Sequence, residues 1–236
     1  PVKIMQFGEG NFLRAFVDWM IDKGNNDGIL NHGIALVQPI GGSDGIKEIF
    51  EKQDCLYHVY LEGIKDKKPV KEIALIKSVT DIINPYAEYK KYEDLFLSEA
   101  LETIISNTTE AGIRYEEGDD LNAQPPKSFP AKVTALLHKR FAKFNGDPTK
   151  GLQIVCCELI EDNGSTLREY VLRHAAANNL GADFEAWVKS ACNFYDTLVD
   201  RIVPGFPKET INQIKDEITL SNSDIFIGWE VYLRDK

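Results

Sequence analysis

Two glycines near the start of the chain are spaced for binding a phosphate group. Gly8 and Gly10 follow an apolar strand pattern that ends at Phe7, and an amphipathic helical pattern comes directly after them. Gly8 would permit a tight turn, and Gly10 would let the backbone approach a pyrophosphate beside the N–H groups of the helix. Because the third glycine of G-x-G-x-x-G would fall at Leu13, the motif is partial, and a strand-turn-helix with chance glycines is the alternative.

Polar residues follow a second predicted strand, at residues 101–105. Asn107 and Thr108 lie at the carboxyl end of this strand, where ligands bind in open α/β sheets. Polar residues at such a strand end suit a ligand crevice, and we expect Glu110 to face this cleft. The alternative is a polar loop that ends at Gly112.

A charged pair, Asp200 and Arg201, interrupts an apolar segment after Leu198 and Val199. Charged side chains are costly to bury without partners, so they either form a structural ion pair or face a polar site. We favour a catalytic or substrate-binding role for Asp200, because functional carboxylates gather in such clefts.

The cysteines and histidines do not indicate a metal site. The sequence contains no C-x-x-C pair and no H-E-x-x-H motif. The residues concerned are Cys55, Cys156, Cys157, Cys192, His32, His58, His138 and His174. We therefore predict no metal, and we interpret the cysteines as small buried hydrophobic residues of a reducing compartment.

Composition and charge narrow the class of protein. With 236 residues and 43% hydrophobic content, the chain is expected to form a globular unit with one sizeable core. The net charge of −10 and the sequence pI near 5.0 disfavour binding to nucleic acid or to an anionic membrane. No apolar run approaches the ~20 residues that span a bilayer, and the start shows no signal pattern, so we expect a cytoplasmic protein.

Strand-like and helical patterns alternate along the chain, which predicts a Rossmann-like α/β fold: a mainly parallel sheet with helices on both faces. Strands are predicted at residues 33–37, 58–61, 73–79, 101–105 and 152–156, the second and third with an antiparallel pairing. Helices are predicted at 11–23, 86–98, 130–144, 165–177 and 184–195. Residues 198–204 are predicted as a strand or a strand leading into a turn, and residues 225–233 as a terminal strand.

Four sequence segments occur in the order typical of one enzyme family. They are FGEGNFLRAF (7–16), SNTTEAGI (106–113), CELIEDNG (157–164) and TLVDRIVP (197–204). On these the chain resembles the mannitol dehydrogenase family of long-chain polyol dehydrogenases. With SFPAKVTALLHKRF (128–141), it is most similar to the members that interconvert D-tagaturonate and D-altronate in hexuronate catabolism. Members acting on fructuronate or mannitol, and a non-catalytic nucleotide-binding module, are the alternatives.

The resemblance implies hydride transfer between NAD and a secondary carbinol of an open-chain sugar acid. It places the cofactor on the first segment and on the strand end described above, with Asn107 and Thr108 contacting its nicotinamide side. The cofactor-binding residues implied are Ile4, Gln6, Phe7, Gly8, Glu9, Gly10, Asn11, Phe12, Leu13, Arg14, Ala15, Asn107 and Thr108. Arg14 would add positive charge near the pyrophosphate, and a solvated helix arginine is the alternative.

The chain departs from the family pattern at three places. Gln38, Pro39 and Ile40 stand where an acid would bind the adenosine ribose, and Asp44 reads as a turn residue, so NAD rather than NADP is implied by the resemblance alone. The family's C-D-N is replaced by Cys-Glu-Leu, and Asn163 is the substitute candidate for binding the developing alkoxide.

The third departure concerns the general acid or base. No lysine is followed by asparagine and histidine as in the family's K-x-x-x-x-N-x-x-H motif. The resemblance therefore implies that residues 1–236 are one dinucleotide-binding domain, whose last ~30 residues lead toward a mostly helical substrate domain.

Overall fold

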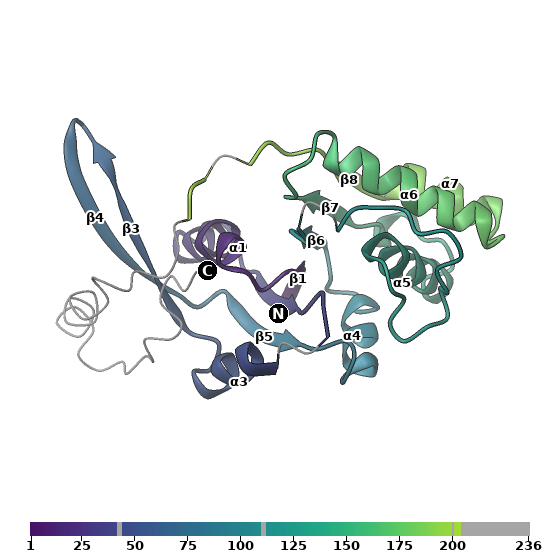
Figure 1. Cartoon of the computed structure of the whole chain (residues 1–236), viewed down its shortest axis with the longest axis horizontal. Coiled ribbons are helices and arrows are strands. Elements are labelled where there is room, and N and C mark those ends of the chain that lie inside the picture. The colour runs from purple at the N-terminus through teal and green to yellow at the C-terminus, as the bar shows by residue number, and fades with distance from the viewer. Residues whose placement is uncertain (42–43, 110–111, 200, 204–236) are drawn as a thin grey trace.

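The computed structural model describes residues 1–41, 44–109, 112–199 and 201–203 (Figure 1). Within this part of the chain, six parallel strands form one sheet in the order β5-β2-β1-β6-β7-β8. The strands are β1 (Val2–Phe7), β2 (Gly33–Val37), β5 (Val79–Ile83), β6 (Thr103–Ser106), β7 (Gln153–Cys156) and β8 (Asn193–Tyr195). The predicted mainly parallel α/β sheet is confirmed.

The carboxyl ends of the central strands are in register. Phe7 pairs with Val37 of β2 and with Ser106 of β6, and Ser106 pairs with Cys156 of β7. After β1, the next two strands of the sheet, β2 and β5, lie on one side of it. The following strand, β6, lies on the other side of β1. This reversal between β1 and β6 opens a crevice at the strand ends, where open α/β sheets bind ligands.

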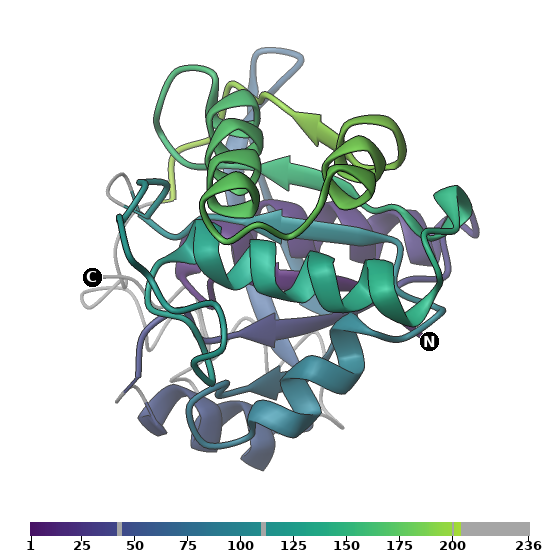
Figure 2. The same ribbon diagram turned by 90° about the vertical axis from the view of Figure 1, so that its right-hand side faces the viewer.

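Helices cover both faces of the sheet, and β1 is therefore buried on both sides. Met5 and Phe7 belong to one core cluster, and Ile4 belongs to the other. The Phe7 face carries α4 (Tyr89–Phe96), α5 (Phe129–Lys143), α6 (Asn163–Ala177) and α7 (Ala182–Ala191), as Figure 2 shows for α5. The Ile4 face carries α1 (Asn11–Ala15), α2 (Val17–Asn26) and α3 (Asp44–Lys52).

Helix α5 is the element that faces the crevice from the Phe7 side. It begins after Ser128, whose hydroxyl accepts a hydrogen bond from the Ala131 N–H at 3.3 Å, and Pro130 fits the first turn. Near the other end, the buried Arg140 guanidinium donates to the carbonyls of Phe96 and Leu101 at 2.7 and 3.1 Å. The helix is therefore capped at its start, and its last turns are bonded to α4 and to the segment before β6.

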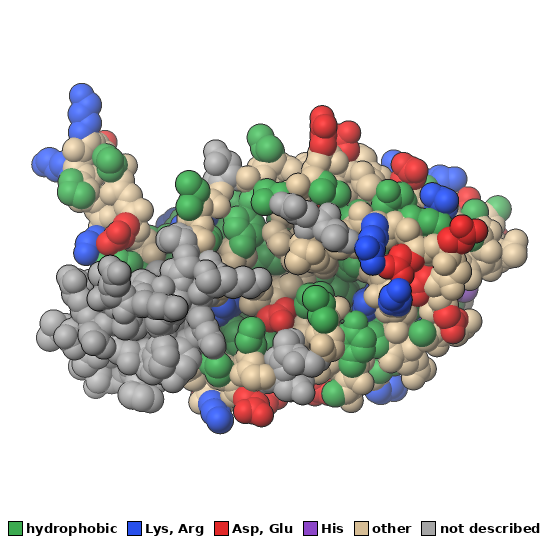
Figure 3. All heavy atoms as spheres, viewed as in Figure 1, with side chains coloured by type: hydrophobic (Ala, Val, Ile, Leu, Met, Phe, Trp, Pro, Cys, Tyr) green, Lys and Arg blue, Asp and Glu red, His purple; other side chains and the backbone are tan. Residues whose placement is uncertain are grey.

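A β-hairpin projects from the body of the molecule (Figure 1). β3 (Tyr57–Lys65) and β4 (Lys68–Ile76) pair antiparallel along their whole length. The predicted antiparallel pairing is confirmed, but the strand predicted at 58–61 continues to Lys65. The base of the hairpin is buried through Tyr57 and Val59, whereas Ile64 near the tip is exposed. In Figure 3 the outer end of this arm carries Lys or Arg side chains.

The predicted strand at residues 73–79 is wrong as a single element. β4 ends at Ile76, and Val79 opens β5, which pairs with β2. The two residues between them are held by α2, because Asp22 accepts a hydrogen bond from the Lys77 N–H at 2.7 Å and Ser78 donates to the Asp18 carbonyl at 2.9 Å. The segment contains neither glycine nor proline, so these hydrogen bonds to α2 end the strand.

The helix predicted at residues 11–23 is divided into α1 and α2. The Phe16 N–H bonds to the Leu13 carbonyl at 3.2 Å, which closes a tighter turn than an α-helix has. The helix predicted at 184–195 also stops early, at Ala191. Cys192 is extended, and the Asn193 N–H donates to Leu152 at 3.0 Å, so the last predicted residues form β8 instead.

Two more predictions differ at turns and termini. Asp44 is the first residue of α3 and not a turn residue. Residues 198, 199 and 201–203 have no regular structure, and Leu198 and Ile202 are exposed, so the predicted strand at 198–204 is absent from the described residues. The strand predicted at 225–233 lies outside the described residues.

Candidate dinucleotide-binding site

Gly8 forms the turn between β1 and α1, and its conformation requires glycine. Its φ is +127°, and a Cβ at this position would lie 2.8 Å from the Asn107 carbonyl oxygen of the neighbouring strand end. The Gly8 N–H donates to Val37 at 3.0 Å. The turn is thus packed between the ends of β2 and β6.

Gly10 is the second glycine of the turn and plays a different part. Its backbone is extended, and a Cβ built on it would meet no described atom within 4 Å. The residue is exposed at the start of α1. Gly10 therefore presents bare backbone to the crevice, as a pyrophosphate would require.

A cleft of about 580 Å³ lies at the switch point between β1 and β6. It is lined by Gly8, Glu9, Gly10, Asn11, Phe12, Arg14, Pro39, Ile40, Ile46, Asn107, Thr108 and Thr109. The structure thus brings together most of the residues predicted to bind the cofactor, from two segments far apart in the sequence. Glu110 lies outside the described residues.

The remaining predicted cofactor residues support the turn from behind. Ile4, Leu13 and Ala15 are buried in the core of the α1 face. Gln6 is also buried, and its Nε2 donates to the Gly8 carbonyl at 3.2 Å. Phe7 lines a second pocket on the α5 side of the same crevice.

Arg14 is held within the site and is not a solvated helix arginine, since only 6% of the residue is exposed. Its guanidinium lies 5.5 Å from the Phe50 ring centroid and 5.7 Å from that of Tyr57. It also donates a hydrogen bond to the Asn11 side-chain oxygen. Arg14 therefore presents a fixed positive charge to the cleft of about 580 Å³.

Glu158, the second residue after β7, organises the opposite wall of the cleft. It is 2% exposed, and its Oε1 accepts hydrogen bonds from the Thr108 N–H at 3.0 Å and the Thr108 hydroxyl at 2.9 Å. Its Oε2 accepts from Ser106 at 3.1 Å. This buried carboxylate fixes the backbone at the end of β6. Sequence reasoning missed this role, although an acid two residues after a buried strand was a signal.

Asn107 and Asn163 use their amides to join neighbouring segments. The Asn107 Nδ2 donates to Cys157 at 2.8 Å. The fully buried Asn163 donates to the Glu158 carbonyl at 3.0 Å and accepts from the Thr197 N–H at 3.0 Å. Asn163 thus ties the start of α6 to the segment after β8, and its role toward an alkoxide stays a prediction.

Of the predicted charged pair, Asp200 lies outside the described residues. The Arg201 guanidinium stacks over the Trp19 ring, 4.9 Å from its centroid, and lies 5.9 Å from that of Phe16. Arg201 therefore contacts the junction of α1 and α2, which is adjacent to the phosphate turn.

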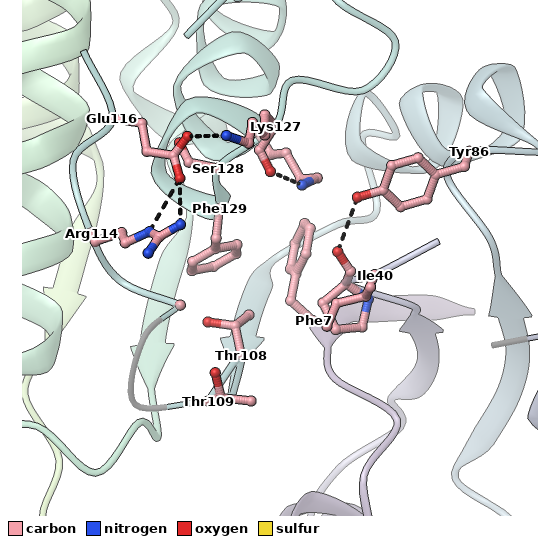
Figure 4. Close-up of a pocket in the computed structure, with 13 residues that line it drawn as sticks. Phe7, Ile40, Tyr86, Thr108, Thr109, Arg114, Glu116, Lys127, Ser128 and Phe129 are labelled. Carbon is pink, nitrogen blue, oxygen red and sulfur yellow. Dashed lines mark hydrogen bonds and ion pairs between the residues drawn. The ribbon is translucent and has the colours of Figure 1, made fainter. Parts of the chain in front are cut away.

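A second pocket, of about 440 Å³, opens from the same crevice toward α5 (Figure 4). It shares Pro39, Ile40, Thr108 and Thr109 with the phosphate cleft. Its other lining residues are Phe7, Tyr86, Gly112, Arg114, Glu116, Lys127, Ser128, Phe129 and Lys132. The two pockets are therefore neighbours that share one wall, and sequence reasoning had not assigned the α5 side to the site.

No group of residues in the described part of the chain is arranged to hold a metal ion. The four cysteines are buried and free, and burial raises the pKa of the Cys55, Cys157 and Cys192 thiols to about 11. The interpretation of the cysteines as buried small residues is confirmed. Among the described residues, no helix is long and apolar enough to cross a membrane.

Comparison with known proteins identifies the same kind of domain. Residues 2–231 match the mannitol dehydrogenase Rossmann domain. Altronate oxidoreductase of Bacillus subtilis is 47% identical over 233 residues, which is 99% of this chain and 48% of that protein. Altronate oxidoreductase of Phocaeicola vulgatus is 42% identical over 236 residues, covering 98% of this chain and 49% of that protein. The chain thus spans about half the length of the curated relatives it matches.

Solved structures share the architecture. Pseudomonas fluorescens mannitol 2-dehydrogenase, in a ternary complex with NAD and D-mannitol, matches with a TM-score of 0.77 and 25% identity, covering 92% of this chain and 45% of that one. A D-sorbitol dehydrogenase matches with a TM-score of 0.71 and 21% identity, covering 94% and 47%. The latter likeness concerns the fold alone.

Proposed function

The chain belongs to the mannitol dehydrogenase Rossmann-domain family, and from this premise we propose that it is the cofactor-binding part of an NAD-dependent oxidoreductase. The reaction proposed is D-tagaturonate + NADH + H⁺ ⇌ D-altronate + NAD⁺. Relatives at 42–47% identity that bear the name altronate oxidoreductase support this choice of substrate. We further propose that the protein works in the cytoplasm and binds neither nucleic acid nor membrane.

The observation that carries the proposal is the phosphate turn at the β1–β6 switch point. Gly8 packs against Asn107, and Gly10 leaves its backbone open to the cleft. Beside this turn, two neighbouring pockets of about 580 and 440 Å³, which share four lining residues, offer enough space for a dinucleotide. The residues present therefore fit the cofactor.

Each part of the cofactor has residues to hold it. The pyrophosphate would lie on the Gly8–Gly10 turn beside the Arg14 guanidinium, where positive charge and bare N–H groups favour it. The nicotinamide half would contact Asn107 and Thr108, whose backbone Glu158 fixes. When bound, the nicotinamide ring supplies or accepts the hydride.

We assign binding and orientation of the cofactor to this chain, and the general acid to the remainder of the enzyme. The sequence lacks a lysine at the family's K-x-x-x-x-N-x-x-H spacing. Loss of a positioned general acid typically lowers a rate by ~10²- to 10⁴-fold. Asp200 and Asn163 remain candidates for contacting the substrate from this side.

The experiment measures NADH binding and NADH oxidation separately. The chain of residues 1–236 and a version extended to the length of the relatives would each be titrated with NADH by fluorescence and assayed with D-tagaturonate. We expect both to bind NADH and only the extended version to turn over. Fructuronate and fructose serve as competing substrates, and a preference for either would replace the substrate proposed. Binding without turnover in both would favour a nucleotide-binding module.

A further inference from the structure

The α5 side of the cleft contains a buried cation that the phosphate turn does not use. Lys132 is 4% exposed and lines the second pocket. Its Nζ donates to the Lys127 carbonyl at 2.7 Å and lies 5.7 Å from the Tyr86 ring centroid. An ammonium has three donors, and this bond accounts for one of them.

The acids near Lys132 are engaged elsewhere. Glu116 forms ion pairs with Arg114 at 2.7 Å and with Lys127 at 3.0 Å. Asp119 accepts hydrogen bonds from the backbone N–H groups of Lys127 and Ser128 at 3.0 and 2.7 Å. No ion pair in the described part of the chain includes Lys132. Burial lowers the pKa of its ammonium to about 8, although Asp119 and Glu116 oppose this shift.

The charge of the residues that line this pocket differs in sign from that of an NAD-selective pocket. An acid at the end of the second strand binds the ribose hydroxyls and repels a 2′-phosphate. Here β2 runs into Gln38 and Pro39, and Ile40 lines the pocket. The charged lining residues are Arg114, Lys127 and Lys132 against Glu116, an excess of positive charge.

The pocket's position fits the adenosine half of a dinucleotide. It continues from the phosphate cleft through Ile40 and Thr109, and Tyr86 and Phe129 add aromatic walls. Figure 4 shows Ile40 and Tyr86 on one side of the space and Glu116, Ser128 and Phe129 on the other. A ribose at this point would have Lys132 as a hydrogen-bond donor.

We infer that Lys132 contacts the adenosine ribose and that the pocket therefore accepts an anionic 2′-phosphate, so that the enzyme binds NADPH as well as NADH. This inference rests on the proposed function, because it presupposes a dinucleotide on the phosphate turn. Lys132 adds a positive charge to a pocket whose β2 end lacks the acid, so a 2′-phosphate is accepted there and not repelled.

The test compares NADH and NADPH on the whole natural protein by fluorescence titration. In the parent protein we expect dissociation constants within about tenfold of each other, and in Lys132→Gln a loss of about 30-fold for NADPH but only several-fold for NADH. Lys132→Arg should restore NADPH binding. Lys143→Gln, which makes the same change outside the pocket on α5, should leave both constants unchanged.

Each alternative outcome is distinct. NADH binding with NADPH excluded by more than about 100-fold, or equal weakening of both cofactors in Lys132→Gln, would overturn the 2′-phosphate assignment but leave the proposed function standing. Failure of the parent protein to bind either cofactor would overturn both. Thermal unfolding of each variant, and competition by adenosine 2′,5′-bisphosphate against 5′-AMP, separates lost contacts from lost folding.

Discussion

The hydroxyl of Tyr57, at the base of the β3–β4 hairpin, donates to the Asp18 carboxylate on α2 at 2.9 Å. The same oxygen lies 3.0 Å from the Arg14 carbonyl. Asp18 is fully buried, and burial, opposed by Tyr57 and Arg14, raises the pKa of its carboxyl to about 7. A titratable group therefore lies directly behind the phosphate turn.

Asp18 should make stability depend on pH. Because its pKa is higher in the folded protein than the ordinary 3.8, the folded state binds the proton more tightly, and the free energy of unfolding falls as pH rises from about 4 to about 7. Asp18→Asn should remove this slope. Urea unfolding at about pH 5 and about pH 8 would measure it. A variant that loses stability mainly at the higher pH would instead show an ionised Asp18 paired with Arg14.

Gly8 and Gly10 should separate stability from cofactor binding. Gly8→Ala forces a Cβ to 2.8 Å from Asn107 at a φ of +127°, so we expect a loss of about 1–3 kcal/mol in the free energy of unfolding. Gly10→Ala has open space and ordinary backbone angles, and its stability should change by less than about 0.5 kcal/mol.

The second half of this prediction concerns affinity. The Cβ in Gly10→Ala would occupy the cleft where the phosphate approaches, so NADH binding should weaken although folding is intact. Paired chemical unfolding and NADH titrations of the two variants give both quantities. Unchanged NADH affinity in Gly10→Ala would argue against a pyrophosphate at this turn.

The residues of the Gly8–Gly10 turn and of the β6 end could be predicted from the sequence, because the patterns that indicate them are local. Gly8 and Gly10 follow β1 directly, and Asn107 and Thr108 follow β6, so strand ends alone bring them together. Lys132, by contrast, lies on α5, well after β6 in the chain. Only the packing of that helix on the Phe7 face brings its side chain to the same crevice.

The boundaries that sequence reasoning missed depend on tertiary contacts. No glycine or proline separates β4 from β5, and hydrogen bonds that Lys77 and Ser78 donate to Asp22 and Asp18 divide them. β8 is only three residues long and continues a helical pattern, and its start is fixed by a bond from Asn193 to Leu152. The polarity pattern of a single segment does not show which residues of other segments will bond to it.

Glu158→Gln should loosen the end of β6. The carboxylate accepts three hydrogen bonds from Thr108 and Ser106, and an amide NH₂ group cannot accept those that face it. We expect a loss of about 1–3 kcal/mol in the free energy of unfolding and weaker NADH binding. The exposed Glu161→Gln serves as the matched control. If both variants retain the parent's stability and affinity, Glu158 does not fix this wall.

Arg14 should contribute to cofactor affinity through both its charge and its planar shape. Arg14→Met removes the charge between the Phe50 and Tyr57 rings, so NADH should bind about tenfold or more weakly, and the dependence of binding on salt should become shallower. Arg14→Lys keeps the charge but not the stacking or the planar fork of N–H donors. Its NADH affinity should therefore lie between that of Arg14→Met and that of the parent protein. Arg168→Met on the exposed side of α6 is the control. Equal salt dependence in Arg14→Met and the parent protein would mean that the guanidinium only packs the turn, because a group that contacts phosphate must change the screening of the interaction when it is lost.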